Sequence, residues 1–385
     1  PKMAALVGHR ISTATRHNTA RVLGAVCIIK RNQSNLTSYK RGTGGRSSFS
    51  GIVATVFGAS GFLGRYVVNK LGKIGSQIIV PYRGDPYHVK NLKLAGDLGQ
   101  VLFLPYQITD PDTLRQVMKY SNTVINLTGR DWETKNFTFD DIHVKGAERI
   151  ARIAKEVGVE RLIHMSALNA SPNPPSIYKN GGSDFLKSKY YGELAVKERF
   201  PEATIIRPAD VFGPEDRFIR YYANGWRRSR GKLPLWKKGE ETIKMPVFCS
   251  DVGEGVINVV KDPATAGNTY EFVGPHGYYL ADLIDYFYRC MRWPGFKRTY
   301  ITPFFRMKVF ALEQAPVTPI ANLDRLEREF VSDVLTDCPT LEDLGVKLTR
   351  IEQRAIWELK PWRRHRYYEE NVGEFADPEP PPVVI

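Results

Sequence analysis

Three glycines are spaced in a way that lets a polypeptide hold a phosphate group. Gly58, Gly61 and Gly64 follow an apolar, β-branched run at residues 52–57 and open a stretch of helical character. The first glycine permits a tight turn, the second lets backbone N–H groups approach a pyrophosphate, and the third permits close packing of helix on strand. The alternative is a strand–helix turn with no ligand. The flanking strand and helix favour a nucleotide-binding loop.

The residues at the end of the second expected strand indicate which dinucleotide this loop would bind. Sites for NAD usually place an Asp or Glu there, where its carboxylate accepts a hydrogen bond from the ribose 2′-hydroxyl. In this chain the segment 77–80 runs into a Pro-Tyr-Arg sequence ending at Arg83, and no acidic residue precedes Asp85. A guanidinium group can instead pair with a 2′-phosphate. We therefore predict NADPH as the cofactor, with a solvent-exposed arginine as the alternative.

Later segments add to these features and resemble a known superfamily. The glycine spacing, an Asn-Leu-Thr-Gly sequence ending at Gly129, Ser166 at the end of a fifth expected strand, and Arg-Pro-Ala at 207–209 are similar to the extended and atypical branches of the short-chain dehydrogenase/reductase superfamily. The resemblance covers about residues 51–290. It implies an NAD(P)-binding Rossmann domain followed by a small, variable C-terminal portion.

The same resemblance implies a catalytic tyrosine that this chain lacks. Active members carry Tyr-x-x-x-Lys on the helix after the fifth strand; the tyrosine gives a proton to the substrate carbonyl, and the lysine lowers the tyrosine pKa and holds the nicotinamide ribose. Lys189 fits this register, but Phe185 stands at the tyrosine position, and a phenyl ring has no proton to give. Tyr190 and Tyr191 would point elsewhere on the helix, and no spacing supports Tyr178 as a substitute. The sequence therefore predicts a cofactor site without ordinary reductase chemistry.

The residues expected to contact the dinucleotide come from the glycine loop and from the ends of the strands. Ser166 and Lys189 would lie near the nicotinamide and its ribose; the alternatives are a hydroxyl group at a strand end and a solvated helix lysine. The full expected set is Gly58, Ser60, Gly61, Phe62, Leu63, Gly64, Arg83, Gln107, Leu127, Thr128, Ser166, Lys189 and Pro208. We predict no catalytic residue and no metal ligand.

Alternating strands and helices must position these residues. Short apolar runs separated by segments of helical periodicity predict a parallel sheet with helices on both faces. The fold class is therefore α/β, a doubly wound Rossmann-type sheet with a smaller α/β C-terminal portion. We expect an N-terminal extension at 1–45, a Rossmann domain at 46–275, and a C-terminal docking region with an extended tail at 276–385. Expected strands lie at 52–57, 77–80, 101–104, 123–127, 162–165 and 203–206, and expected helices include 140–157 and 184–199.

Positive charge is concentrated at the N-terminus. The 385 residues include 55 Lys and Arg against 41 Asp and Glu, a formal net charge of +14, and nine of the basic residues fall in residues 1–50, which hold no acid. A basic segment rich in Ser and Thr with short apolar clusters is typical of a mitochondrial transit peptide; a disordered basic tail is the alternative. A basic chain invites a nucleic-acid interpretation, which this uneven distribution weakens.

Composition excludes several other classes of protein. A charged fraction of 25% and a hydrophobic fraction of 42% are ordinary for a folded globular chain. The sequence contains no run of about 18 apolar residues, so it predicts no membrane-spanning helix. The four cysteines, Cys27, Cys249, Cys290 and Cys338, are scattered, which predicts neither a metal site nor a disulfide framework.

Several longer segments resemble one family. Over about residues 40–350, they are similar to the NADPH-binding accessory subunits of mitochondrial complex I, the alpha-subcomplex subunit 9 type of NADH:ubiquinone oxidoreductase. The resemblance implies a peripheral, matrix-side subunit of the inner membrane, at the junction of the peripheral and membrane arms near the quinone site. It also implies a structural NADPH outside the electron-transfer chain, although this family often keeps Tyr where this chain has Phe185. The segments are 45–51, 53–68, 124–137, 210–218, 272–275 and 341–345, of which the sequence Gly-Arg-Asp-Trp-Glu-Thr-Lys-Asn-Phe ending at Phe137 is the most specific.

Arginine and aromatic residues alternate in two later segments, 217–232 and 361–368. This mixture is enriched at protein interfaces and suits anionic lipid headgroups or single-stranded RNA; a solvated basic surface is the alternative. We interpret these segments as docking surfaces and expect other complex I subunits as partners, contact with anionic lipid, and no nucleic acid. The apolar segment 303–312 is too short to span a membrane. It could equally lie at a membrane interface, pack against a partner or pack in the core. An active NADPH-dependent reductase and an RNA-binding member of the fold stay open as alternative functions.

Overall fold

The computed structural model describes residues 40, 42–228, 231–314, 321–364 and 376–385. The predicted transit peptide therefore lies almost entirely outside the described residues, as do Cys27 and parts of both Arg/aromatic segments. In the described part of the chain, no helix is long and apolar enough to cross a membrane. The same residues contain no group of His, Cys, Asp and Glu side chains suited to a metal ion.

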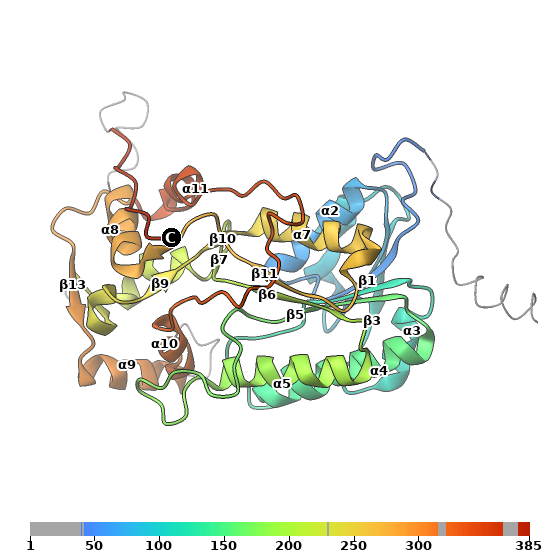
Figure 1. The fold of residues 1–385 in the computed structure, drawn as a ribbon, viewed down its shortest axis with the longest axis horizontal. Helices are drawn as coiled ribbons and strands as arrows, with labels where there is room; N and C mark the ends of the chain where they lie inside the picture. Colours follow the sequence, from blue (N-terminus) through green and yellow to red (C-terminus); the bar gives the residue numbers. More distant parts are fainter. Residues whose placement is uncertain (1–39, 41, 229–230, 315–320, 365–375) are drawn as a thin grey trace, which may run out of the picture.

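A seven-stranded sheet forms the centre of the molecule (Figure 1). All its pairings are parallel, and the spatial order is β11-β6-β5-β4-β1-β2-β3. Winding reverses between β1 and β4, so a crevice forms at their carboxyl ends, where such folds bind ligands. This confirms the predicted doubly wound sheet. The strands are β1 (Val53–Phe57), β2 (Gln77–Tyr82), β3 (Val101–Pro105), β4 (Thr123–Asn126), β5 (Arg161–Met165), β6 (Thr204–Pro208) and β11 (Thr269–Phe272).

Helices cover both faces of this sheet, as predicted (Figure 1). On one face α2 (Phe62–Lys73) packs against α7 (Cys249–Lys261). The other face carries α3 (Pro111–Met118), α4 (Ala147–Val157) and α5 (Asp184–Arg199). A wider π-helical turn at Asp140–Gly146 runs directly into α4, so the expected helix at 140–157 changes pitch along its length. Gly158 ends α4 because its φ of 84° lies in the left-handed region that favours glycine.

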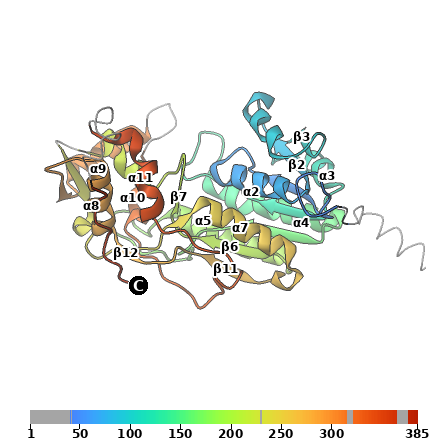
Figure 2. The same cartoon turned by 90° about the horizontal axis from the view of Figure 1, so that it is seen from above.

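A smaller lobe lies at the carboxyl ends of the strands (Figures 1 and 2). Its apolar core draws buried side chains from residues 212–359, on both sides of the expected boundary at 275; the domain division stays a prediction. Its paired strands are β7 (Val211–Phe212) with β10 (Val247–Phe248), β8 (Lys232–Leu235) with β13 (Lys297–Tyr300), and β9 (Ile243–Lys244) with β12 (Tyr278–Tyr279). Its helices are α6 (Ile219–Ala223), α8 (Leu280–Cys290), α9 (Pro303–Glu313), α10 (Leu323–Glu329) and α11 (Glu352–Glu358).

The first Arg/aromatic segment packs largely inside this lobe. Tyr221, Tyr222 and Arg227 are buried, and Arg228 lies 4.2 Å from the ring of Trp293. The interpretation of this segment as an exposed docking surface is therefore wrong for Tyr221, Tyr222 and Arg227. Considered with their sequence neighbours alone, these arginines look like free surface cations. In the fold, acidic and aromatic residues from distant parts of the sequence contact them.

An ion pair shielded from solvent joins this segment to α10. The Arg227 guanidinium donates to both carboxylate oxygens of Glu329, at 2.7 and 2.9 Å, and 0% and 3% of the two side chains are exposed. The Tyr221 hydroxyl also donates to Glu329, at 3.2 Å. The ring of Phe305 lies 4.8 Å from the guanidinium carbon. Because neither charge reaches water, removing one partner would leave the other buried and uncompensated.

We therefore expect Arg227→Met to lower the free energy of unfolding by about 3–5 kcal/mol. The matched control is Arg152→Met, which breaks an exposed ion pair with Glu156 on α4 and should cost no more than about 0.5 kcal/mol. Denaturant unfolding of the full chain measures both. Equal, small losses in the two variants would contradict a structural role for the buried pair.

Candidate dinucleotide-binding site

The glycine loop lies between β1 and α2, at the crevice between β1 and β4. Gly58 has a φ of +76°, and a Cβ there would lie 2.8 Å from the Leu127 carbonyl oxygen. A Cβ on Gly64 would lie 2.4 Å from the Gly58 carbonyl oxygen, so this position must be glycine for α2 to pack. At Gly61 a Cβ would meet only the Gly58 carbonyl oxygen within 4 Å, at 3.1 Å. The first and third glycines thus shape the turn, whereas a Cβ at the second would be crowded only by the Gly58 carbonyl oxygen.

A cavity of about 630 Å³ lies over this loop. Its volume is in the range of sites that hold a cofactor. Gln107 is not among its lining residues: it is exposed, and its backbone exchanges hydrogen bonds with the Thr113 hydroxyl. The expected residues that line the cavity are Gly58, Ser60, Gly61, Phe62, Leu63, Gly64, Arg83, Leu127, Thr128, Ser166, Lys189 and Pro208.

Several lining residues were missed from the sequence. Tyr106 follows β3, and Arg130, Asp131 and Trp132 follow β4. Because parallel strands end at one edge of a sheet, the position of these residues after strands was an available signal. Arg217 also lines the cavity; it comes from the loop between β7 and α6, and no local pattern marks it.

Two arginines in this cavity lack a carboxylate partner. Arg83 lies 5.6 Å from the ring of Phe137, and Arg130 lies 5.5 Å from the ring of Trp132. Neither forms an ion pair with any carboxylate in the part of the chain that the structure describes. Burial, and then the nearby charges of Arg83 and Arg217, lower the pKa of Arg130. Unneutralised guanidinium groups in a cleft are suited to bind phosphate oxygens.

The opposite end of the cavity offers a hydroxyl and an ammonium group. Ser166 is buried, and its hydroxyl has no hydrogen-bond partner among the described residues. The Lys189 ammonium is also buried and donates to the Met165 carbonyl oxygen at 3.1 Å. Burial lowers the pKa of Lys189 to about 8, against the opposing effect of Glu193. Both groups can form hydrogen bonds with ribose hydroxyls, so this end of the cavity fits the sugar of a dinucleotide.

Phe185 lies beside Lys189, as the helical register requires. Its ring packs edge-on against His143, with 5.3 Å between ring centroids, and 5.8 Å separates its centroid from the Lys189 Nζ. Burial, and then the charge of Lys189, hold the pKa of His143 well below its ordinary value. Tyr190 and Tyr191 pack on each other instead, and Tyr178 packs on Trp236. None of the three tyrosines takes the place of the missing hydroxyl.

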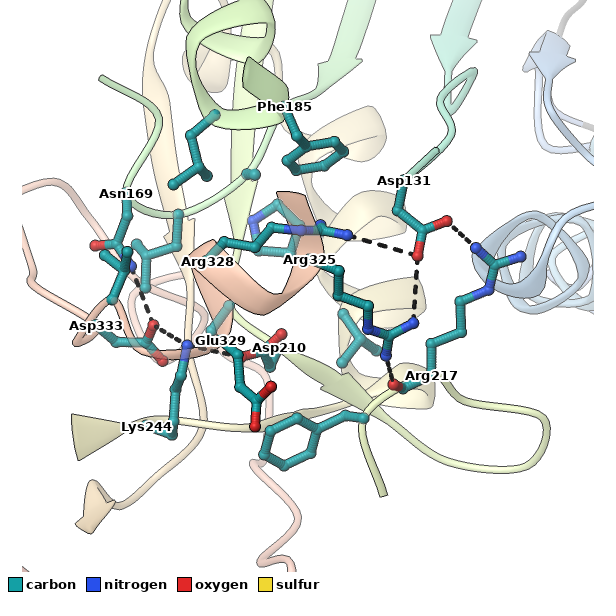
Figure 3. Close-up of a pocket in the computed structure, with 18 of the residues that line it drawn as sticks. Asp131, Asn169, Phe185, Asp210, Arg217, Lys244, Arg325, Arg328, Glu329 and Asp333 are labelled. Carbon is teal, nitrogen blue, oxygen red and sulfur yellow. Dashed lines mark hydrogen bonds and ion pairs between the residues drawn. The ribbon is translucent and has the colours of Figure 1, made fainter. Parts of the chain in front are cut away.

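A second cavity, of about 280 Å³, shares Ser166, Phe185 and Pro208 with the first (Figure 3). Asp131 lies between them and accepts a hydrogen bond from Arg217. Arg325 and Arg328 of α10 lie 3.5 and 3.6 Å from the same carboxylate. Burial opposes ionisation of Asp131, but the three guanidinium groups outweigh it and hold its pKa below the ordinary value.

The far end of this second cavity contains another buried charge cluster (Figure 3). The Lys244 ammonium lies 3.0 Å from Asp210 and 3.6 Å from Asp333. Asn169 donates a hydrogen bond to Asp333 at 3.1 Å. At this end of the cavity Lys244 is therefore paired with carboxylates, in contrast to Arg83 and Arg130 in the first cavity.

Comparison with known proteins agrees with the fold described above. The model of the NAD dependent epimerase/dehydratase family matches residues 54–272. Among solved structures, a triphenylmethane reductase of Citrobacter sp. has a TM-score of 0.60 at 16% identity and covers 80% of this chain and 99% of its own. The Bordetella bronchiseptica enzyme WbmH, solved in complex with NAD+, has a TM-score of 0.57 at 15% identity and covers 82% and 99%. At these identities the structures support the fold alone.

Two curated relatives match nearly the whole chain. The mouse protein named NADH dehydrogenase (ubiquinone) 1 alpha subcomplex subunit 9, mitochondrial, is 44% identical over 395 aligned residues, covering 99% of this chain and 100% of its own. The Neurospora crassa NADH-ubiquinone oxidoreductase 40 kDa subunit, mitochondrial, is 35% identical over 370 residues, covering 93% and 94%. The chain therefore belongs to the alpha subcomplex subunit 9 family of NADH dehydrogenase (ubiquinone), within the wider NAD dependent epimerase/dehydratase family.

Proposed function

We propose that this protein is an accessory subunit of mitochondrial complex I that holds NADPH as a structural group. It would act on the matrix side of the inner membrane, at the junction of the peripheral and membrane arms near the quinone site. The full-length match to relatives named as subunits of this enzyme supports membership of the complex. The observation that carries the nucleotide assignment is the pair of unneutralised arginines, Arg83 and Arg130, in a cavity over the glycine loop.

Charge favours the phosphorylated form of the dinucleotide. The cations that line the large cavity are Arg83, Arg130, Lys189 and Arg217, and the only carboxylate among its described lining residues is that of Asp131. NADPH carries a 2′-phosphate in addition to its pyrophosphate, so it neutralises this excess better than NADH. Arg83 follows β2, where the adenine ribose lies in such folds, and would bind the 2′-phosphate. Arg130 would lie near the phosphates from the other side of the crevice.

The residues around the nicotinamide end support a structural role for the nucleotide. NADPH supplies a hydride when a substrate and a proton donor are in place, but Phe185 offers no proton here. Tyr221 also lines the second cavity, yet its hydroxyl donates to Glu329, and burial raises its pKa. Ser166 and Lys189 would bind and orient the ribose. An active NADPH-dependent reductase remains the alternative and would need an acid from elsewhere.

The 2′-phosphate assignment predicts a selective loss of affinity. Arg83→Ala should weaken NADPH binding about 10- to 100-fold, the range of a hydrogen-bonded charge, and should leave NADH binding nearly unchanged. Lys90→Ala is the matched control, since Lys90 is an exposed cation nearby that does not line the cavity. Titration calorimetry of the purified chain measures both ligands. An equal loss for NADPH and NADH would overturn the assignment of Arg83.

The glycine loop predicts a loss of nucleotide without loss of the fold. Gly61→Val places a branched side chain in the open space over the loop, where the pyrophosphate would lie, and should abolish retention of nucleotide. Gly45→Val is the control, because a Cβ there meets nothing within 4 Å. Nucleotide released on denaturation is identified by absorbance and mass, and thermal unfolding confirms the fold. Full retention by Gly61→Val would refute the loop assignment.

The structural role predicts a defect in assembly. In mitochondria that lack the native subunit, the wild-type chain and Gly45→Val should migrate in native gels within a complex many times larger than the chain itself. Gly61→Val should reduce the amount of that complex. A wild-type chain that migrates only as a monomer would reject membership of complex I, and normal assembly with nucleotide-free Gly61→Val would reject a structural role for NADPH.

A further inference from the structure

Two mostly buried cations lie against the same aromatic ring. The Arg328 guanidinium carbon is 4.1 Å from the Phe185 ring centroid, and the Lys189 Nζ is 5.8 Å from it. Lys189 is 6% exposed, and 20% of the Arg328 side chain is exposed. Figure 3 shows the Arg328 side chain passing below the Phe185 ring toward Asp131. One cation comes from α5 and the other from α10, so the lobe and the sheet each contribute positive charge to this point.

The carboxylates nearby do not cancel this charge. Asp131 is shared by Arg217, Arg325 and Arg328. Glu193, the acid closest in sequence to Lys189, is bound by Arg207 at 3.0 and 2.7 Å.

Two further contacts complete this account of the charges. Asp324 accepts hydrogen bonds from the Ser183 hydroxyl and the Asp184 amide, at 3.0 and 2.7 Å, and lies 3.9 Å from the Arg328 Nε. Lys189 forms no ion pair within the described chain. Asp324 also accepts a hydrogen bond from the Phe185 amide at 3.4 Å. Four cations, Lys189, Arg217, Arg325 and Arg328, thus stand against two carboxylates, Asp131 and Asp324, in this part of the site.

Burial and the nearby charges both shift the pKa values of the buried groups His143 and Lys189. Besides burial, the charge of Lys189 and then those of His164 and Arg328 lower the pKa of His143. Burial lowers the pKa of Lys189, the charge of Glu193 opposes that shift, and Arg328 adds a smaller lowering effect. In a mostly buried setting such charges act with little screening by solvent.

The two redox forms of the nucleotide differ in charge at this end alone. The oxidised nicotinamide ring carries a positive charge, whereas the reduced dihydronicotinamide ring is neutral. The ribose, the pyrophosphate and the 2′-phosphate are identical in the two forms. On the proposed function, the ring lies beside Ser166, Phe185 and Lys189, so Arg328 and Lys189 would repel the oxidised ring and not the reduced one.

We propose that Lys189 and Arg328 make this site selective for the redox state of its nucleotide, so that it binds NADPH more tightly than NADP+. This inference rests on the proposed function, because it needs a dinucleotide in the large cavity. Tighter binding of one form shifts the bound couple toward that form by the same factor. The subunit would thus keep its structural nucleotide reduced without any catalytic turnover.

The experiment compares dissociation constants for NADPH and NADP+ on the purified full chain. We expect the wild-type chain to prefer NADPH by about tenfold, the effect of roughly one pKa unit of electrostatic interaction. Arg328→Met keeps the aliphatic stem and removes the charge, so the ratio of the two constants should fall at least threefold. Arg328→Lys keeps a charge and should retain most of the preference. Arg152→Met, remote on α4, should leave the ratio unchanged.

Two further variants keep the proposal open to refutation if Arg328→Met fails to fold. Lys189→Met should weaken both ligands through the ribose while moving their ratio toward one. Asp131→Asn removes the nearby negative charge and should move the ratio the other way, further in favour of NADPH. Equal wild-type affinities, or a ratio unchanged in the charge-removing variants, would overturn the inference. A chain that binds neither form, or binds NADH more tightly than NADPH, would instead refute the proposed function.

Discussion

The arrangement of the site depends on one carboxylate held by three guanidinium groups. Asp131 follows β4 and meets Arg217 from the loop before α6 and Arg325 and Arg328 from α10. A carboxylate as buried as that of Asp131 is costly without cationic partners. Three segments that are far apart in the sequence are thereby fixed around the crevice where the sheet reverses direction. The wall between the two cavities is a direct consequence of this cluster.

Carboxylates of helix α10 also attach it to α5 and to the loop before α5. Asp324 accepts hydrogen bonds from Ser183 and Asp184 at the start of α5, and Glu327 accepts from backbone amides at Tyr178 and Lys179. The helix that carries Phe185 and Lys189 is therefore tied to the smaller lobe at its N-terminal end. A nucleotide in the crevice would contact parts of both units, which gives a physical reason for a structural cofactor: binding it stabilises their relative position.

The two ends of the large cavity differ in which groups of a ligand their charges would bind. Near β2 and β4, Arg83 and Arg130 lack acids and would be neutralised by phosphates. Around Phe185 the surplus charge has no phosphate to meet and acts on the ring of the nicotinamide instead. With a dinucleotide bound as proposed, one end would favour the phosphorylated form and the other would favour its uncharged, reduced ring.

The sequence by itself determined the sheet, the glycine loop and the register of Phe185 and Lys189. These follow from local rules: apolar strand periodicity, the left-handed φ of Gly58, and the i, i+4 spacing on one helix. It named Gln107, which does not line the cavity, and it presented Arg227 and Tyr221 as surface residues. Only the tertiary structure decided these points, because whether an arginine is buried, paired or free depends on acids far away in the chain. Glu329 neutralises Arg227 from 102 positions away, and Arg328 reaches Phe185 from another lobe. Spacing along a strand or helix carries no information about such contacts.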